Sequence, residues 1–171
     1  MILRPATERD VPALSRLGED SFRAAFGHLY DPADLSGFLA SVYSREAVAG
    51  EIADPAFIHC LAERDGKLIG FCKLKMPGWY DGHSSAKNPI SLGQLYVDPS
   101  LTGGGVGAAL MEWALEEARA RQADAIQLSV WSGNHGAQRF YARYGFSKIA
   151  DIYFWVGNHR DDEYLYELRL N

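Results

Sequence analysis

The stretch that decides the fold runs from a strand through a glycine loop into a helix: Leu95-Tyr96-Val97-Asp98-Pro99-Ser100-Leu101-Thr102-Gly103-Gly104-Gly105-Val106-Gly107. Apolar residues end the strand, Asp98-Pro99 turns the chain, and the helix is predicted to begin at Val106. The start of a helix leaves its first backbone N–H groups unpaired and carries a partial positive charge. Because glycines let the backbone curl closely around an anion, this loop predicts a phosphate-binding site.

Three alternatives compete for this loop. A P-loop requires Lys directly after its glycines, and no Lys follows them here. A dinucleotide-binding fingerprint is nominally present as Gly103-x-Gly105-x-x-Ala108, but its acidic partner belongs about 20 residues further on, near Trp131, whereas Asp124 precedes that strand. A tight turn that merely caps the strand would not need so many glycines. The loop therefore favours a phosphate-bearing ligand of another class.

Hydrophobic patterning extends the prediction outward over the chain. A hairpin is expected at Asp65-Gly66, and residues 77–89 are expected to form a loop. We predict strands at 3–5, 57–64, 67–76, 91–97, 125–130, 146–150 and 163–170, and helices at 7–25, 31–42, 45–52, 106–121 and 134–144. This order predicts one domain, residues 1–171, of the α+β (mixed α/β) class, with helices on the faces of a mixed sheet.

Composition excludes several classes of protein. The chain has 171 residues, of which 47% are apolar, and a net charge of -5. That charge argues against a nucleic-acid binder held by phosphate contacts. No apolar run approaches the ~18 residues that a membrane span needs, and residues 1–5 do not begin a secretory signal. We therefore expect a cytoplasmic protein with neither a nucleic-acid nor a membrane partner.

The two cysteines and the histidines indicate neither a disulfide nor a metal site. Cys60 and Cys72 lie on the two arms of the predicted hairpin. A two-residue turn would pair residue 60 with residue 71, which puts the two thiols on opposite faces of the sheet. A disulfide is therefore not expected, and both cysteines are interpreted as buried thiols in a reducing compartment. The five histidines show no metal-ligand spacing, so no metal is expected.

A second motif follows the glycine loop after one helix and one strand: Asn134-His135-Gly136-Ala137-Gln138-Arg139-Phe140-Tyr141-Ala142-Arg143-Tyr144-Gly145-Phe146. It fits the pattern N-x-x-A-x-x-F-Y-x-x-x-G-F, and the glycine loop fits Q/R-x-x-G-x-G/A at every position except the first. In this order and at this separation, the two motifs resemble the GNAT superfamily of N-acetyltransferases. The expected order of elements is similar over the rest of the chain.

The resemblance implies a sheet splayed between its fourth and fifth strands, with acetyl-CoA bound in the gap. Backbone groups of residues 95–97 would pair with the pantetheine arm, and the loop backbone would hold the pyrophosphate. Asn134, which is also a good helix cap, would bond to the pantetheine region, and Tyr141 would stand near the thioester sulfur as the general acid. The implied cofactor-binding residues are Leu95, Tyr96, Val97, Thr102, Gly103, Gly104, Gly105, Val106, Gly107, Ala108 and Asn134.

The loop departs from the family pattern in its charge. It begins with Thr102, where Gln or Arg is usual, and residues 98–110 contain neither Lys nor Arg. Pyrophosphate binding is therefore expected to depend on backbone N–H groups. A cation would come from elsewhere in the chain, such as Arg139 or Arg143.

The general base is left open by the sequence. An alkylamine has a pKa near ~10.4, so the acceptor must lose a proton before it attacks. Many relatives carry a glutamate in the strand before the loop, but the matching position here is Gly93, followed by Gln94. Asp81 and His83, in the loop at 77–89, could assist deprotonation, although solvated loop residues are the simpler interpretation.

A weaker resemblance concerns the acceptor. Residues 21–26 and 31–35, with the layout near 153–161, are similar to PaiA-type bacterial spermine/spermidine acetyltransferases. This implies transfer to a primary amine of a small molecule, with a polyamine as the leading acceptor. The acidic residues expected to attract a second ammonium are Glu19, Asp20, Asp31 and Asp34. The alternatives are an acetyltransferase for an amino acid or a protein N-terminus, and a non-catalytic acyl-CoA-binding or sensing domain. A homodimer is compatible with either.

Overall fold

A computed structural model describes residues 1–101 and 103–170, and a seven-stranded mixed sheet forms its centre. The strands are β1 (Ile2–Pro5), β2 (Phe57–Arg64), β3 (Lys67–Lys75), β4 (Pro89–Val97), β5 (Ala125–Trp131), β6 (Ser147–Val156) and β7 (His159–Arg169). The helices are η1 (Glu8–Asp10), α1 (Val11–Phe26), η2 (Gly27–Leu29), α2 (Pro32–Tyr43), α3 (Arg45–Ala53), α4 (Val106–Ala120) and α5 (His135–Arg143). The order across the sheet is β1-β2-β3-β4-β5-β7-β6.

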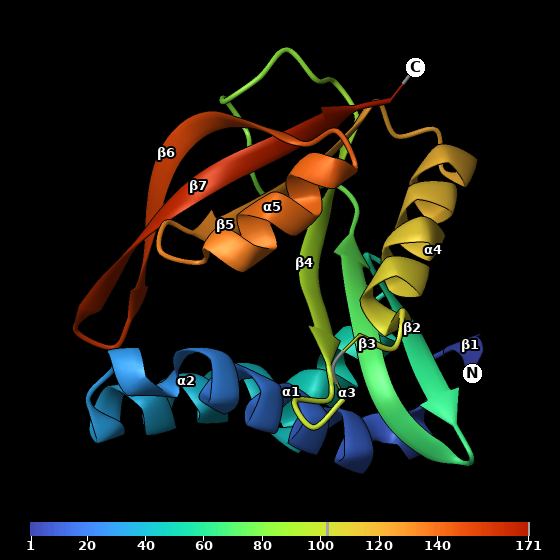
Figure 1. Ribbon diagram of the computed structural model, residues 1–171, viewed down its shortest axis with the longest axis vertical. Coiled ribbons are helices and arrows are strands. Elements are labelled where there is room, and N and C mark those ends of the chain that lie inside the picture. The colour runs from blue at the N-terminus through green and yellow to red at the C-terminus, as the bar shows by residue number, and fades with distance from the viewer. Residues whose placement is uncertain (102, 171) are drawn as a thin grey trace.

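The two parallel strands β4 and β5 come apart partway along their length. Their pairing covers residues 89–91 of β4 and 125–127 of β5, and beyond this the strands diverge (Figure 1). On its other side β4 stays paired with β3 as far as Val97, with a register shift that skips Gly93. The expected splay between the fourth and fifth strands is confirmed. It leaves the edge of β4 that faces β5 open over residues 92–97.

Helices cover both faces of this sheet (Figure 1). α4 and α5 pack on one face, over a core that includes Leu74, Leu110 and Ile126. The helices α1 and α3 pack on the other face, over Leu61 and Phe71. Because neighbouring residues of a strand point to opposite faces, β2 and β3 contribute to both cores. The gap between β4 and β5 therefore connects the two helical layers.

The predicted register of the β2–β3 hairpin is wrong beyond its turn. The turn at residues 65–66 is present, with φ of 53° and 75°. A bulge between residues 62 and 63 then shifts the pairing, so that Cys60 faces Cys72 and both lie on the same face. The bulge sends Ile69 into the core under α4, a packing contribution that turn chemistry does not encode. Both cysteines are buried and free, as the sequence predicted.

The C-terminal hairpin is longer than predicted. The strands expected at 146–150 and 163–170 continue as β6 and β7 until they meet at a turn formed by Gly157 and Asn158. Gly157 has a φ of 56°, and the N–H of Asn158 donates to Oδ1 of Asp34 at 3.2 Å. This bond ties the turn to the first turn of α2. The extra strand length brings residues 159–163 to the central gap.

Candidate functional site

The glycine loop connects the end of β4 to the start of α4. Gly103 and Gly105 both have a φ of 71°, in the region that favours glycine, and Gly105 is the N-cap of α4. The first helical bond runs from Ala109 N–H to the Gly105 carbonyl at 3.0 Å, so the N–H groups of residues 106–108 precede it. In the described chain, no atom lies within 4 Å of a Cβ built on Gly103 or Gly105. This backbone is therefore open to an anion, while Thr102 lies outside the described residues.

Arg64, at the end of β2, supplies a cation beside the glycine loop. Its Nη2 lies 3.9 Å from a Cβ built on Gly104. The sequence pointed instead to Arg139 or Arg143 as the source of a cation, and the guanidinium of Arg143 lies 5.7 Å from the ring centre of Phe140. Arg64 was missed because it belongs to a distant hairpin that the fold brings to the loop.

A cavity of about 230 Å³, which we call the central pocket, lies where β4 and β5 diverge. It is lined by Phe22, Phe26, Tyr30, Phe38, Val42, Tyr43, Leu92, Gly93, Gln94, Leu95, Tyr96, Ser129, Val130, Trp131, Asn134, Ala137, Tyr141, Phe154, Asp161 and Glu163. Its volume is several times the ~30 Å³ that one water molecule occupies. The lining comes from α5 on one side of the sheet and from α1 and α2 on the other, so the central pocket passes between the two layers. Four predicted residues meet there: Leu95, Tyr96, Asn134 and Tyr141.

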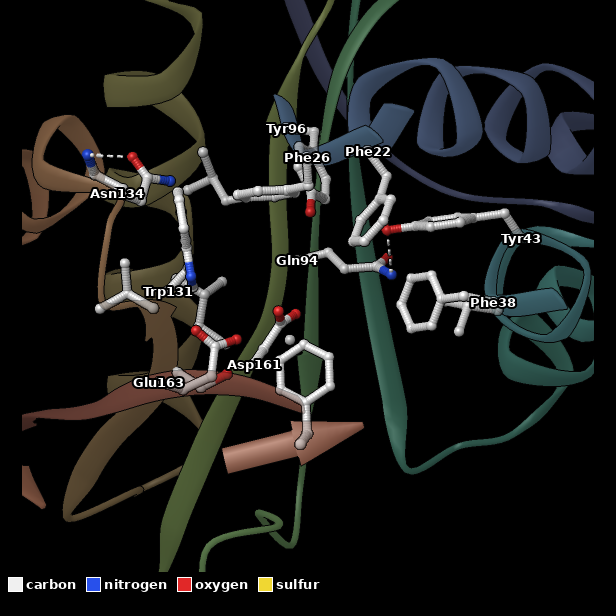
Figure 2. Close-up of a pocket in the computed structure, with 18 of the residues that line it drawn as sticks. Phe22, Phe26, Phe38, Tyr43, Gln94, Tyr96, Trp131, Asn134, Asp161 and Glu163 are labelled. Atoms are coloured by element: carbon white, nitrogen blue, oxygen red, sulfur yellow. Dashed lines mark hydrogen bonds between the residues drawn. The ribbon is translucent and has the colours of Figure 1, made fainter. Parts of the chain in front are cut away.

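Aromatic rings from α1 and α2 form one wall of the central pocket (Figure 2). The ring of Phe22 is the centre of this wall. Its centroid lies between 4.6 and 6.1 Å from those of Phe26, Tyr30, Phe38 and Tyr43. Aromatic faces are electron-rich and attract cations. The wall is therefore suited to an alkyl chain that carries positive charge.

Two carboxylates, Asp161 and Glu163, point into the central pocket from one face of β7 (Figure 2). They are 2% and 6% exposed. The hydroxyl of Tyr30 donates to Oδ2 of Asp161, and Nε2 of His159 lies 3.2 Å from Oδ1. Glu163 faces Trp131 across the β5–β7 pair, and within the described chain its Oε2 has no hydrogen-bond partner.

The surroundings of these two acids perturb their titration. Burial, and then the negative charge of Asp161, raise the pKa of Glu163 to about 8. Burial also raises the pKa of Asp161, although the bond from Tyr30 and the nearby His159 oppose that rise. A carboxyl with a pKa near neutrality can gain and lose a proton during a reaction cycle.

Sequence reasoning missed both of these acids. The acidic residues that it named instead were Glu19, Asp20, Asp31 and Asp34. All four lie outside the lining of the central pocket in the described chain, and Asp34 binds the β6–β7 turn. In the structure, residues 161, 163, 165 and 167 are buried and alternate with more exposed neighbours, as in a half-buried strand. In the sequence, Leu165 is the one apolar residue of these four, so only a strand extended back from it with a period of two would have grouped the two acids on its face.

Tyr141 and Asn134 bring the second motif to the central pocket. The ring of Tyr141 packs edge to face on Phe146, with centroids 5.8 Å apart. Burial raises the pKa of Tyr141, so its hydroxyl stays protonated at neutral pH. Oδ1 of Asn134 accepts the N–H of Ala137 at 3.1 Å, which confirms the predicted helix cap.

Position 93 has no room for a side chain. A Cβ built on Gly93 would lie 2.9 Å from the ring of Trp79 and 3.2 Å from Cε of Lys73. The neighbouring Gln94 donates from Nε2 to the hydroxyl of Tyr43 at 3.2 Å (Figure 2). β4 itself contains no acidic residue. β4 therefore offers no carboxylate that could act as a base.

Two further properties concern residues 1–101 and 103–170. Within them, no three side chains of His, Cys, Asp or Glu are grouped so that they could hold a metal ion. None of the helices in the same residues combines the length and the apolar character that crossing a membrane requires.

A family model, relatives in sequence and a solved structure that resemble this chain are all N-acetyltransferases. The acetyltransferase (GNAT) family model matches residues 17–146. An uncharacterised N-acetyltransferase of Lactobacillus delbrueckii subsp. lactis is 27% identical over 93% of this chain and 91% of its own length. The aminoalkylphosphonate N-acetyltransferase of Salmonella typhimurium is 33% identical over 61% of this chain and 66% of its own length. The crystal structure of the PaiA N-acetyltransferase of Thermoplasma acidophilum with coenzyme A has a TM-score of 0.79 at 20% identity, covering 99% of this chain and 98% of that one.

Proposed function

Because this chain belongs to the acetyltransferase (GNAT) family, an enzyme family that takes its acetyl group from acetyl-CoA, we propose that it transfers that group to a primary amine of a small cationic molecule. The observation that carries the proposal is the lining of the central pocket. Tyr141, the open edge of β4 and two buried carboxylates, Asp161 and Glu163, all line this one pocket. Donor and acceptor can therefore meet in the gap between β4 and β5.

The donor would bind on the side of α4 and α5. The N–H groups of the glycine loop and of residues 106–108 would hold the pyrophosphate, and each hydrogen bond to a charged oxygen contributes about 1.5–3 kcal/mol. Arg64 would add a positive charge at the loop. The pantetheine arm would lie along residues 95–97, where β5 leaves the edge of β4 open. This path leads the thioester toward Tyr141 and Asn134.

The acceptor would enter from the side of α1 and α2. Two buried carboxylates attract an ammonium strongly because the pocket shields them from water, and the aromatic wall adds cation–π attraction. A dication can neutralise both Asp161 and Glu163, so a polyamine or diamine is the leading acceptor. An amino acid would bring its own carboxylate toward two like charges. The α-amine of a protein N-terminus, which lacks that carboxylate, is the second candidate.

The amine would attack the thioester carbonyl directly once it has lost a proton, because an alkylammonium has a pKa near ~10.4. A backbone N–H near Tyr96 or Val97 would stabilise the tetrahedral oxyanion. The carbon–sulfur bond then breaks, and the departing sulfur needs a proton. The hydroxyl of Tyr141 is protonated because burial raises its pKa, so it can donate to that sulfur as negative charge develops.

The test is a panel of amines with acetyl-CoA, in which release of free CoA is measured. We expect spermidine and short α,ω-diamines to give larger kcat/KM values than monoamines or free amino acids. Turnover of amino acids without turnover of any polyamine would contradict the proposed acceptor. A protein that binds CoA tightly but acetylates nothing in the panel, N-terminal peptides included, would contradict the transfer itself.

A further inference from the structure

The two carboxylates of the central pocket have unequal surroundings. Oδ2 of Asp161 accepts a hydrogen bond from Tyr30, and its Oδ1, which has no hydrogen-bond partner in the described chain, lies 3.2 Å from Nε2 of His159. Glu163 is 6% exposed, and in the described chain nothing donates to its Oε2. Donors and a neighbouring ring nitrogen stabilise an ionised carboxylate, whereas burial beside a like charge favours the protonated form. Burial raises the pKa of both acids, but hydrogen bonding and a nearby ring nitrogen oppose the rise only at Asp161, so the two pKa values differ, as in pairs where one acid holds charge and the other exchanges a proton.

We propose that Glu163 is the general base of this enzyme: it accepts the proton of the acceptor's ammonium, while Asp161, oriented by Tyr30, keeps its charge and holds the substrate's positive end. This inference rests on the proposed function, since it requires an ammonium acceptor in the central pocket. Glu163 faces Trp131, the last residue of β5, just before the segment that leads to Asn134 and α5. The ring of Trp131 lies 6.4 Å from that of Phe26 in α1, so Glu163 lies on the acceptor side of the gap, whereas Tyr141 of α5 lines it from the donor side.

The proton balance is complete without any further reactant. The ammonium transfers one proton to Glu163, and the neutral nitrogen attacks the thioester carbonyl. Tyr141 gives its proton to the sulfur as the carbon–sulfur bond breaks, and the second proton of the adduct nitrogen then restores the hydroxyl of Tyr141. Glu163 returns its proton to water when the acetylated product leaves. The products are the amide, free CoA and one proton.

Burial lowers the free-energy cost of this transfer. In a shielded cavity the ammonium and the carboxylate both lose hydration, which narrows the free-energy gap between the ion pair and the neutral amine with a neutral carboxylic acid. The raised pKa of Glu163, about 8, lies closer to the pKa of an alkylammonium than an ordinary glutamate does. The titratable side chains near Glu163 are Asp161, Tyr30, Tyr80 and Tyr96, and His159 lies beside Asp161. Burial raises the pKa of all three tyrosines, so they stay protonated through neutral pH.

The test is the pH dependence of kcat/KM for wild type and Glu163→Gln, with the best amine of the panel. The wild type should show a rising limb with a midpoint near the pKa of Glu163, about 8. The variant can use only amine that is already neutral in solution, about one molecule in 10³ at pH 7.5 for a pKa of ~10.4. We expect turnover to fall by about 10²–10⁴-fold at pH 7.5. The loss of turnover should become smaller toward pH 10, and the pH profile of the variant should lack the rising limb near pH 8.

Matched variants separate this role from a structural one. Asp162→Asn removes one negative charge from the adjacent, exposed position of β7 and should keep the wild-type profile. Glu163→Asp keeps a carboxylate and should retain the limb at a reduced rate. Glu163→Gln should bind CoA as the wild type does, because Glu163 lies on the acceptor side of the gap.

Three outcomes would overturn the inference. One is a Glu163→Gln variant with more than a tenth of wild-type turnover at pH 7.5. Another is an equal loss at every pH, which would make Glu163 a binding or structural residue. A wild type without turnover on any amine would instead remove the proposed function, and the inference would fall with it.

Discussion

The glycine loop and the central pocket are built from different parts of the polypeptide. The loop is one contiguous segment that presents backbone N–H groups, and its requirements are glycines at φ of 71° and a helix start. The central pocket is assembled from side chains of helices and strands throughout the chain. A backbone site depends on few residue identities, so it suits a donor shared by a whole family. A side-chain site changes with each substitution, so the central pocket is where acceptor choice is expected to reside.

The largest effect is expected at Tyr141, which lines the central pocket from α5. Tyr141→Phe keeps the ring that packs on Phe146 and removes the hydroxyl. We expect kcat to fall by about 10²–10⁴-fold, equivalent to ~2.7–5.4 kcal/mol in barrier, because the departing sulfur loses its proton donor. CoA affinity and the KM for the amine should change far less. Steady-state kinetics and calorimetry with CoA measure the two quantities.

Tyr144→Phe is the matched control for Tyr141→Phe. It removes a hydroxyl from a tyrosine three residues away, which packs on Phe140 at 5.2 Å between centroids. This variant should turn over at close to the wild-type rate. If the two variants had equal activity, Tyr141 would not be the proton donor.

The next largest effect tests the loop alone. Gly105→Val puts a β-branched side chain at a φ of 71° and fills space that the structure leaves open for an anion. Loss of one hydrogen bond to a charged oxygen, about 1.5–3 kcal/mol, predicts CoA affinity ~10- to 150-fold weaker. Calorimetry on folded protein measures this.

Gly104→Ala is the control for the loop variant, because Gly104 lacks a positive φ and its added Cβ would make ordinary contacts at 3.9 Å with Arg64 and Val106. It should bind CoA almost normally. Equal losses of affinity in both variants would mean that general crowding of the loop, rather than the conformation at Gly105, determines binding.

The same contrast explains what the sequence could predict. The order of elements, the left-handed glycines of the loop before α4 and the cap at Asn134 follow from neighbours in the chain, because helix starts and left-handed glycines are local features. The splay of β4 from β5 came from the resemblance rather than from periodicity. The structure brings Leu95, Tyr96, Asn134 and Tyr141 to the central pocket, and their roles in binding and catalysis remain predictions.

The missed features depend on contacts between distant segments. The bulge that aligns Cys60 with Cys72 is fixed by packing of Ile69 under α4, not by the turn. The run Arg160-Asp161-Asp162 has the composition of a loop, yet it belongs to β7, where it pairs with residues 153–155 of β6. The predicted strand at 163–170 included Glu163 but not Asp161, so the sequence did not show that the two acids share one face.

A smaller effect is expected on the free energy of unfolding, because the central pocket buries the carboxyl group of Glu163. Below its ordinary pKa of 4.5, Glu163 is protonated in both folded and unfolded chains, so wild type and Glu163→Gln should have similar stabilities. Between pH 4.5 and about 8 the unfolded chain ionises first, and the wild type loses stability as the pH rises. The variant has no such loss. Allowing for water at the pocket, we expect its free energy of unfolding to exceed that of the wild type by roughly 1–2 kcal/mol at pH 9.

Thermal melts without ligand at pH 4 and pH 9 measure this difference. For a chain of this size, 1 kcal/mol corresponds to about 2–4 °C in Tm. The variant should melt several degrees higher at pH 9 and together with the wild type at pH 4. A variant that is less stable at pH 9 would show that Glu163 has a partner that stabilises its charge, which contradicts the unequal pair described above.

The smallest effect is expected at Arg64, whose guanidinium the fold brings close to the backbone of the glycine loop. Its guanidinium lies near Gly104 but is reached by water, and exposed ion pairs contribute about 0.2–1 kcal/mol. Arg64→Gln should therefore weaken CoA binding by only about 1.5- to 5-fold at low salt. Raising the ionic strength to 0.5 M should remove most of the difference, because salt screens exposed charges.

Arg16→Gln is the control, because Arg16 is exposed on α1, on the other face of the sheet. This variant should leave CoA affinity unchanged at both salt concentrations. A loss beyond about 100-fold at Arg64, or one that persists in high salt, would mean that a side chain shares the work of the loop backbone. The donor region would then resemble the central pocket in depending on residue identity, and the contrast between the two regions would fail.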